Sequence, residues 1–174
     1  MTFTFESAIE EAQSLLDSEN LAEAERVART KTLLETEAGA RGFFVVYLTG
    51  DAPLADQAPD WLLTLLAQAP DSVSELLVKN LAMSTATALA HEAQGNLEQA
   101  DGSRQVAERT TLLLQTLGRP PFGPVPALEQ KKAAMLQTLK EKQGVYSPFL
   151  ERWAYDAAQR EAIGRAFQNV TRPS

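Results

Sequence analysis

Apolar residues recur at spacings of three and four along most of this 174-residue chain, and this pattern limits its fold more than any other feature. Such a spacing places side chains on one face of an α-helix. One run with β-forming residues occurs at 43–48, but no second run is present to pair with it. The sequence therefore predicts an all-α protein, an irregular multi-helix bundle of antiparallel hairpins with a smaller C-terminal helical segment.

The apolar stripes and the turn residues between them set the expected helix boundaries. The predicted helices cover 5–16, 21–48, 61–66, 73–94, 97–117, 127–142, 147–153 and 156–169. Gly39 and Gly42 lie inside the second of these, so either the helix breaks there or two helices approach closely across the glycines. Asp156 is the expected N-cap of the last helix.

Residues 118–126 contain four prolines and two glycines, which is the clearest interruption of the helical pattern. The composition predicts an extended linker of the polyproline type at 119–126. On this basis a main helical bundle covers 1–118. A basic, aromatic-rich helical tail covers 127–174 and is expected to pack on that bundle.

Residues 95–100, Gly-Asn-Leu-Glu-Gln-Ala, followed by Ala107, resemble the central turn of a tetratricopeptide-type helical hairpin. Residues 19–24, Glu-Asn-Leu-Ala-Glu-Ala, are similar, with Glu in place of the first Gly. The resemblance implies helical hairpins in which small alanines let the paired helices interlock. Because the turns at 19 and 95 lie 76 residues apart, which is no multiple of the 34-residue repeat, we favour the irregular bundle.

The absence of cysteine and the presence of one histidine exclude several kinds of chemistry. Disulfides, thiolate metal sites, a cysteine nucleophile and a histidine-rich metal site cannot form. His91 near a helix end is expected to interact with terminal carbonyls of its helix. The phosphate-binding, dinucleotide-binding and serine-nucleophile motifs are also missing. We therefore expect no catalytic residues, no bound metal and no cofactor.

Charge is unevenly distributed along the chain, whose net charge is −7. Residues 1–103 hold 17 acidic and 5 basic residues, whereas residues 104–174 hold 6 acidic and 11 basic residues. The two halves either attract each other or face different partners. The net negative charge argues against a nucleic-acid partner. Because no apolar run is long enough for a bilayer and residues 1–12 are unlike a signal peptide, we expect a cytoplasmic protein without membrane attachment.

Five of the twelve aromatic residues lie in the last thirty residues, interleaved with arginines. Aromatic and arginine side chains often anchor protein interfaces. The predicted partner-binding residues are Trp153, Tyr155, Phe149 and Arg152 in the tail, followed by Tyr47 and Arg41 beside the glycine pair. In the alternative interpretation the tail folds back and buries Phe149, Trp153 and Phe167 as core.

These patterns favour a non-catalytic helical protein-interaction module, such as an adaptor, assembly factor or regulatory subunit. An apolar groove between helices, rimmed by charge, would receive a protein or peptide partner. The alternative is a helical protein that binds a small molecule in an apolar pocket between helices. This alternative includes an enzyme. A self-associating chain, for example a homodimer, is the third hypothesis.

Overall fold

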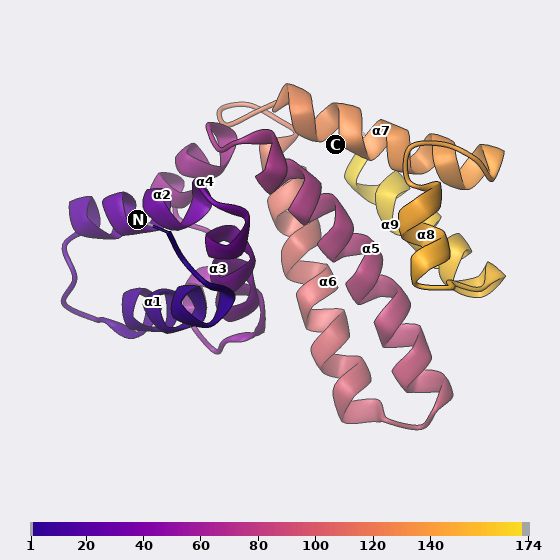
Figure 1. Ribbon diagram of the computed structural model, residues 1–174, viewed down its shortest axis with the longest axis horizontal. Helices are drawn as coiled ribbons and strands as arrows, with labels where there is room; N and C mark the ends of the chain where they lie inside the picture. Colours follow the sequence, from indigo (N-terminus) through magenta and orange to yellow (C-terminus); the bar gives the residue numbers. More distant parts are fainter. Residues whose placement is uncertain (1, 172–174) are drawn as a thin grey trace. The chain divides into compact units, whose positions relative to one another are not determined.

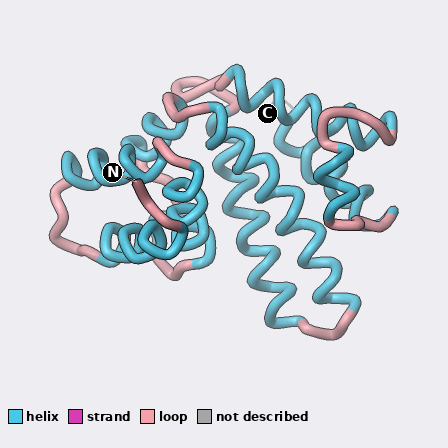
Figure 2. Tube along the Cα trace, viewed as in Figure 1, coloured by secondary structure: helices cyan, strands magenta, loops and turns pink. Residues whose placement is uncertain are grey.

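The computed structural model describes residues 2–171, which form helices joined by turns and loops (Figures 1 and 2). Within this range there is no strand, which confirms the predicted all-α fold. The α-helices are α1 (Phe5–Asp17), α2 (Glu23–Leu34), α3 (Glu37–Thr49), α4 (Asp60–Ala67), α5 (Asp71–Ala93), α6 (Leu97–Leu117), α7 (Pro126–Glu141), α8 (Ser147–Arg152) and α9 (Ala157–Thr171). A short 3₁₀ helix, η1 (Pro53–Ala55), follows α3.

Side chains at the predicted helix starts satisfy backbone N–H groups that have no partner within the helix. At α1, the Ser7 amide donates to Thr4 Oγ1 at 3.1 Å, and the Thr4 amide donates to Ser7 Oγ at 3.0 Å. At α9, the Gln159 amide donates to Asp156 Oδ1 at 2.8 Å, and the Asp156 amide donates to Gln159 Oε1 at 2.9 Å. These reciprocal pairs are capping boxes, and they confirm Asp156 as an N-cap.

The chain divides into two compact units, Met1–Leu76 and Leu77–Ser174. The division falls within α5, and not at residue 118 where the proline-rich segment led us to expect a boundary. The physical reason lies in the packing of α9 against both α6 and α7. Because α9 contacts helices on either side of the proline-rich segment, the tail shares a unit with the α5–α6 hairpin.

In the first unit, α3 packs against both α1 and α2. The predicted helix over 21–48 is interrupted after Leu34, and Thr36 caps the new helix by accepting a hydrogen bond from the Gly39 amide at 3.0 Å. Further along α3, Gly42 faces α1, where a Cβ at this position would lie 2.5 Å from the Cβ of Ala8. The helix therefore breaks before the two glycines and not at them, whereas the close approach that they suggested occurs at Gly42.

Aromatic side chains of α3 fill the centre of the first unit. The Phe43 ring stacks on the Tyr47 ring at 5.5 Å between centroids and meets the Phe44 ring edge-on at 5.3 Å. All three side chains are buried. An ion pair adds to this packing, because Arg29 of α2 donates to Glu11 of α1 at 2.6 Å. This hydrogen bond raises the pKa of Arg29 above its ordinary value.

In the second unit, α5 and α6 form an antiparallel hairpin (Figure 1). Gly95 has a φ of +76°, a conformation that glycine adopts without the steric cost of a Cβ. The Asn96 amide donates to the His91 carbonyl at 2.9 Å, which closes the end of α5. Arg104 of α6 lies 3.6 Å from Glu92 of α5 across the hairpin. The predicted turn at 95 and the predicted helix at 97–117 are confirmed.

The proline-rich segment is a compact turn and not the extended linker that its composition suggested. The Gly123 amide donates to the Arg119 carbonyl at 2.8 Å, and the Val125 amide donates to the Leu117 carbonyl at 3.1 Å. The peptide bonds 120–121 and 123–124 are both cis. Because Val125 returns to the last residue of α6, the chain reverses and α7 begins beside the end of α6.

A buried lysine joins the elements of the second unit. The Lys132 side chain of α7 is 1% exposed, and its ammonium lies 2.6 Å from Glu129 Oε1 and 3.0 Å from the Val170 carbonyl of α9. The lysine therefore supplies a donor to one of the last carbonyls of α9, where backbone acceptors have no partner within the helix.

The close approach of α1 and α3 predicts a specific sensitivity at Gly42. A Gly42→Ala substitution places a methyl group against Ala8, and we expect the free energy of unfolding to fall by about 1–3 kcal/mol, as overpacking of a core does. The matched control is Gly102→Ala in α6, where a Cβ would meet no atom within 4 Å. That change should raise the free energy of unfolding by up to about 1 kcal/mol, the helix-propensity difference. Urea unfolding followed by circular dichroism measures both; equal effects of the two substitutions would contradict the close approach.

The buried ion pair predicts a second difference, between two lysines of α7. Lys132→Ala should lower the free energy of unfolding by roughly 3 kcal/mol, the lower end of the range for a broken buried pair, because Glu129 keeps some access to water. Lys140→Ala, at an exposed position on the same helix, should change it by less than about 0.5 kcal/mol. The same urea unfolding experiment applies. A Lys132→Ala protein as stable as the Lys140→Ala protein would show that the ammonium does not hold α7 to α9.

Candidate functional site

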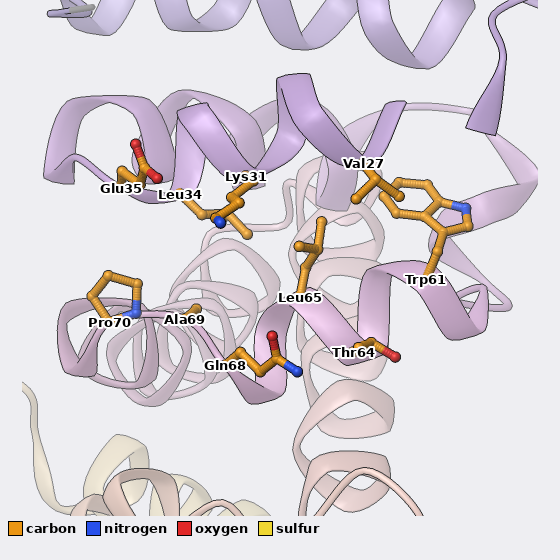
Figure 3. A pocket seen from close by; sticks show the side chains of 10 residues that line it. All are labelled: Val27, Lys31, Leu34, Glu35, Trp61, Thr64, Leu65, Gln68, Ala69 and Pro70. Carbon is orange, nitrogen blue, oxygen red and sulfur yellow. The ribbon is translucent and has the colours of Figure 1, made fainter. Parts of the chain in front are cut away.

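The first unit contains a groove between α2 and α4 with a volume of about 610 Å³. Figure 3 shows Val27 beside Trp61 at one end of this α2–α4 groove and Glu35 at the end that contains Pro70. The two helices therefore run in the same direction along the groove. From α2 it is lined by Val27, Lys31, Leu34 and Glu35, and from α4 and the following turn by Trp61, Thr64, Leu65, Gln68, Ala69 and Pro70.

Helical spacing explains why these side chains meet. Val27, Lys31 and Leu34 follow one another at spacings of four and three, so they share one face of α2. Trp61 and Leu65 are four residues apart and share a face of α4. The two faces lie at least 27 residues apart in the sequence, and the packing of α2 beside α4 brings them together.

The groove has an apolar interior and a polar rim. On the α2 side Leu34 is 2% exposed, while on the α4 side Trp61 and Leu65 are half-buried. The polar lining residues, Lys31 and Glu35 on one side with Thr64 and Gln68 on the other, are exposed. The arrangement suits an apolar group that enters the groove while polar atoms at its edges remain near water. Among residues 2–171, no group of three or more acidic or histidine side chains is placed to hold a metal ion.

The predicted residues at positions 41 and 47 lie elsewhere in the first unit. Tyr47 is fully buried, and its hydroxyl donates to the Leu54 carbonyl at 2.6 Å, so the side chain ties α3 to η1. Arg41 is exposed, with its guanidinium 5.2 Å from the centre of the Phe5 ring. Neither residue lines the α2–α4 groove.

The predicted tail residues are divided between core and surface in the second unit. Phe149 is half-buried and meets Tyr146 and Tyr155 edge-on, at 6.4 Å and 6.1 Å between ring centroids. Tyr155 is 9% exposed, and its burial raises the pKa of its phenol. Trp153 is 49% exposed and carries the Arg152 guanidinium 5.8 Å from the ring centre. The tail thus packs part of its aromatic set and leaves Trp153 with Arg152 at the surface.

Two other predictions have definite outcomes. Phe167 is fully buried, as the core interpretation of the tail requires. His91 lies in the last turn of α5, but its buried Nδ1 accepts or donates no hydrogen bond among the residues that the structure describes. This nitrogen therefore forms no bond to a terminal carbonyl of α5.

Sequence reasoning missed the α2–α4 groove, although it contained one indication of it. The segment 61–66 is apolar on nearly all sides, a pattern that is typical of a buried helix. An eight-residue helix that packs beside α2 cannot cover its whole circumference, so Trp61 and Leu65 remain partly open. An excess of apolar side chains on a short helix was therefore the available sign of an open site.

The structure is that of an all-α protein with an apolar groove between two helices, α2 and α4, that run in the same direction. A family model described as "Uncharacterised conserved protein UCP020893" matches residues 4–170, so the chain belongs to this family. No curated protein and no solved structure matches the chain. Among residues 2–171, no helix has both the length and the apolar character that crossing a membrane requires.

The positions of Trp153 and Phe167 predict opposite results for two truncations in the second unit. Phe167→Ala should lower the free energy of unfolding by about 3–5 kcal/mol, because it empties a fully buried site. Trp153→Ala should lower it by less than about 1 kcal/mol, because the ring is half in water. Thermal and urea unfolding of both variants test this. Comparable losses would place Trp153 in the core.

Proposed function

We propose that this chain is a non-catalytic protein-interaction module, an adaptor, assembly factor or regulatory subunit, whose α2–α4 groove binds a segment of a partner protein. The observation that supports the proposal is the apolar interior of a groove that stays open along two helices. Burial of a single leucine or phenylalanine side chain in such a site contributes roughly 1.5–3 kcal/mol. The cytoplasmic location expected from the sequence belongs to the same proposal.

The shape of the groove favours a peptide segment over a small molecule. Small-molecule pockets typically enclose 70–90% of a ligand's surface. Here Trp61 and Leu65 are only half-buried, and the four polar lining residues are exposed, so an occupant would keep one side in water. A partner helix that lies between α2 and α4 fits this geometry, because its apolar face contacts the groove and its polar face remains in water.

A small molecule is the second candidate function. The volume of about 610 Å³ lies within the range of 300–1,000 Å³ that is usual for ligand pockets. A protein segment and a small molecule differ in mass, so one experiment that measures the mass of the bound partner distinguishes the two candidate functions.

Photo-crosslinking from the rim of the groove tests the proposal. With benzoylphenylalanine in place of Gln68, irradiation in a lysate of the source cells should produce a covalent adduct of protein mass, identified by mass spectrometry. Thr64→Arg, on the exposed rim, and Leu65→Glu, in the interior, should each remove the adduct, because both introduce a charge beside the apolar occupant. Circular dichroism shows whether each variant retains its helices.

The control places benzoylphenylalanine at Glu98, an exposed position of α6, where no adduct is expected. A further variant has benzoylphenylalanine in place of Trp153, since the sequence predicted a partner site there. An adduct at position 153 and none at position 68 would move the site to the tail. An adduct of small-molecule mass at position 68 would favour the second candidate over a protein segment.

A further inference from the structure

Charged residues are unevenly distributed around the α2–α4 groove. Two exposed carboxylates flank each end of the apolar interior. Glu23 lies one helical turn before Val27 on the same face of α2, and Asp60 directly precedes Trp61. At the other end, Glu35 lines the groove and Asp71 directly follows Pro70.

The basic residues of the first unit do little to offset these carboxylates. Residues 1–76 contain 14 acidic and 4 basic residues. Arg26 donates to the carbonyls of Leu15 and Ser18, and Arg29 donates to Glu11, so both guanidinium groups are directed toward α1 and the loop after it.

The remaining two basic residues of that range occupy different places. Arg41 lies over the Phe5 ring, away from the groove. Lys31 lies at the middle of the groove, on its rim. The charge pattern along the groove is therefore negative at both ends, with one positive group between them.

From this pattern we infer that the occupant is an amphipathic helix of net positive charge, supplied by a partner protein. The inference rests on the proposed function and adds the chemistry of the partner. Its apolar side chains, spaced by three and four, lie against Leu34, Leu65 and Trp61. Its basic residues lie near the carboxylates at the two ends, and one acidic residue faces Lys31.

The dimensions of the groove set the length of this helix. From Glu23 to Glu35, α2 advances twelve residues, or about 18 Å at 1.5 Å per residue. A partner helix of about three turns spans that distance. A helix of this length presents about four apolar side chains to the groove, whereas an extended strand over the same distance presents about three.

Trp61 provides a direct reporter, because the chain has two tryptophans and Trp153→Phe leaves Trp61 as the single indole. The probes are three synthetic 16-residue peptides with the same leucine positions. Their polar positions are lysine in the basic peptide, glutamine in the neutral peptide and glutamate in the acidic peptide. Each is titrated into the full chain while Trp61 fluorescence is recorded.

We expect the basic peptide to bind at least about tenfold more tightly than the neutral one, a difference equivalent to about 1.4 kcal/mol. The acidic peptide should bind most weakly. The preference should shrink as salt rises from 0.05 to about 0.5 M, because screening weakens interactions between exposed charges. Glu35→Lys should reduce the preference, whereas Glu10→Lys, an equal change of net charge on an exposed face of α1, should reduce it much less.

The outcomes separate the inference from the function on which it rests. If the neutral or acidic peptide binds as tightly as the basic one, the groove takes a helix but the inferred charge of the partner is wrong. If none of the three changes Trp61 fluorescence, both the inference and the proposed function are contradicted. The protein could instead form a dimer, with twice the mass of one chain at high concentration, that the Leu65→Glu substitution abolishes. That result would assign the groove to a second copy of the chain and overturn the inference.

Discussion

The first unit depends on the close approach of α1 and α3 at Gly42, where a Cβ would lie 2.5 Å from the Cβ of Ala8. Because α3 contributes no side chain at this contact, it lies close to Ala8 of α1 and turns its aromatic residues inward. Phe43, Phe44 and Tyr47 fill the interior and are buried. The position of α2 follows from this, since it packs on α3 and is joined to α1 by the pair between Arg29 and Glu11.

The α2–α4 groove is a consequence of that arrangement. On α2, Thr30 and Leu33 are buried on the side that packs toward the core. Val27 and Lys31 lie on the neighbouring face, where α4 provides the opposite wall. An eight-residue helix cannot close this face completely, so an apolar surface stays open beside a unit whose exposed charge is mostly acidic. The proposed function follows from these two properties together.

The helical spacing of apolar residues predicted most elements, because that signal is local. The helix at 97–117 and the caps at Gly95 and Asp156 follow from residues within a few positions of each other. The compact turn at residues 119–126 could not be predicted in this way, since it depends on the hydrogen bond from the Val125 amide to the Leu117 carbonyl at the end of α6, beside the bond within the segment from Gly123 to Arg119. The division of the chain into units could not be predicted from local spacing either. It depends on the packing of α9 against α6 and α7, which are separate segments of the sequence.

The sequence predicted the type of candidate site but not the residues that line it. An apolar groove between helices with a charged rim was expected, but its walls come from segments whose contact is set by tertiary packing. The residues chosen for their type, such as Tyr47, include a buried core side chain, because aromatic character is common to interfaces and interiors. Position in the fold, and not residue type, distinguishes Trp61 from Tyr47.

The proposed binding site requires that the α2–α4 groove is open in solution. Acrylamide quenching of the Trp153→Phe protein measures the access of solvent to Trp61, and the Trp61→Phe protein gives the value for half-exposed Trp153 as a reference. An open groove predicts clear quenching of Trp61, to a smaller extent than that of Trp153, because the Trp61 indole is half-buried. If acrylamide does not quench Trp61, the groove is closed in solution and cannot receive a partner segment.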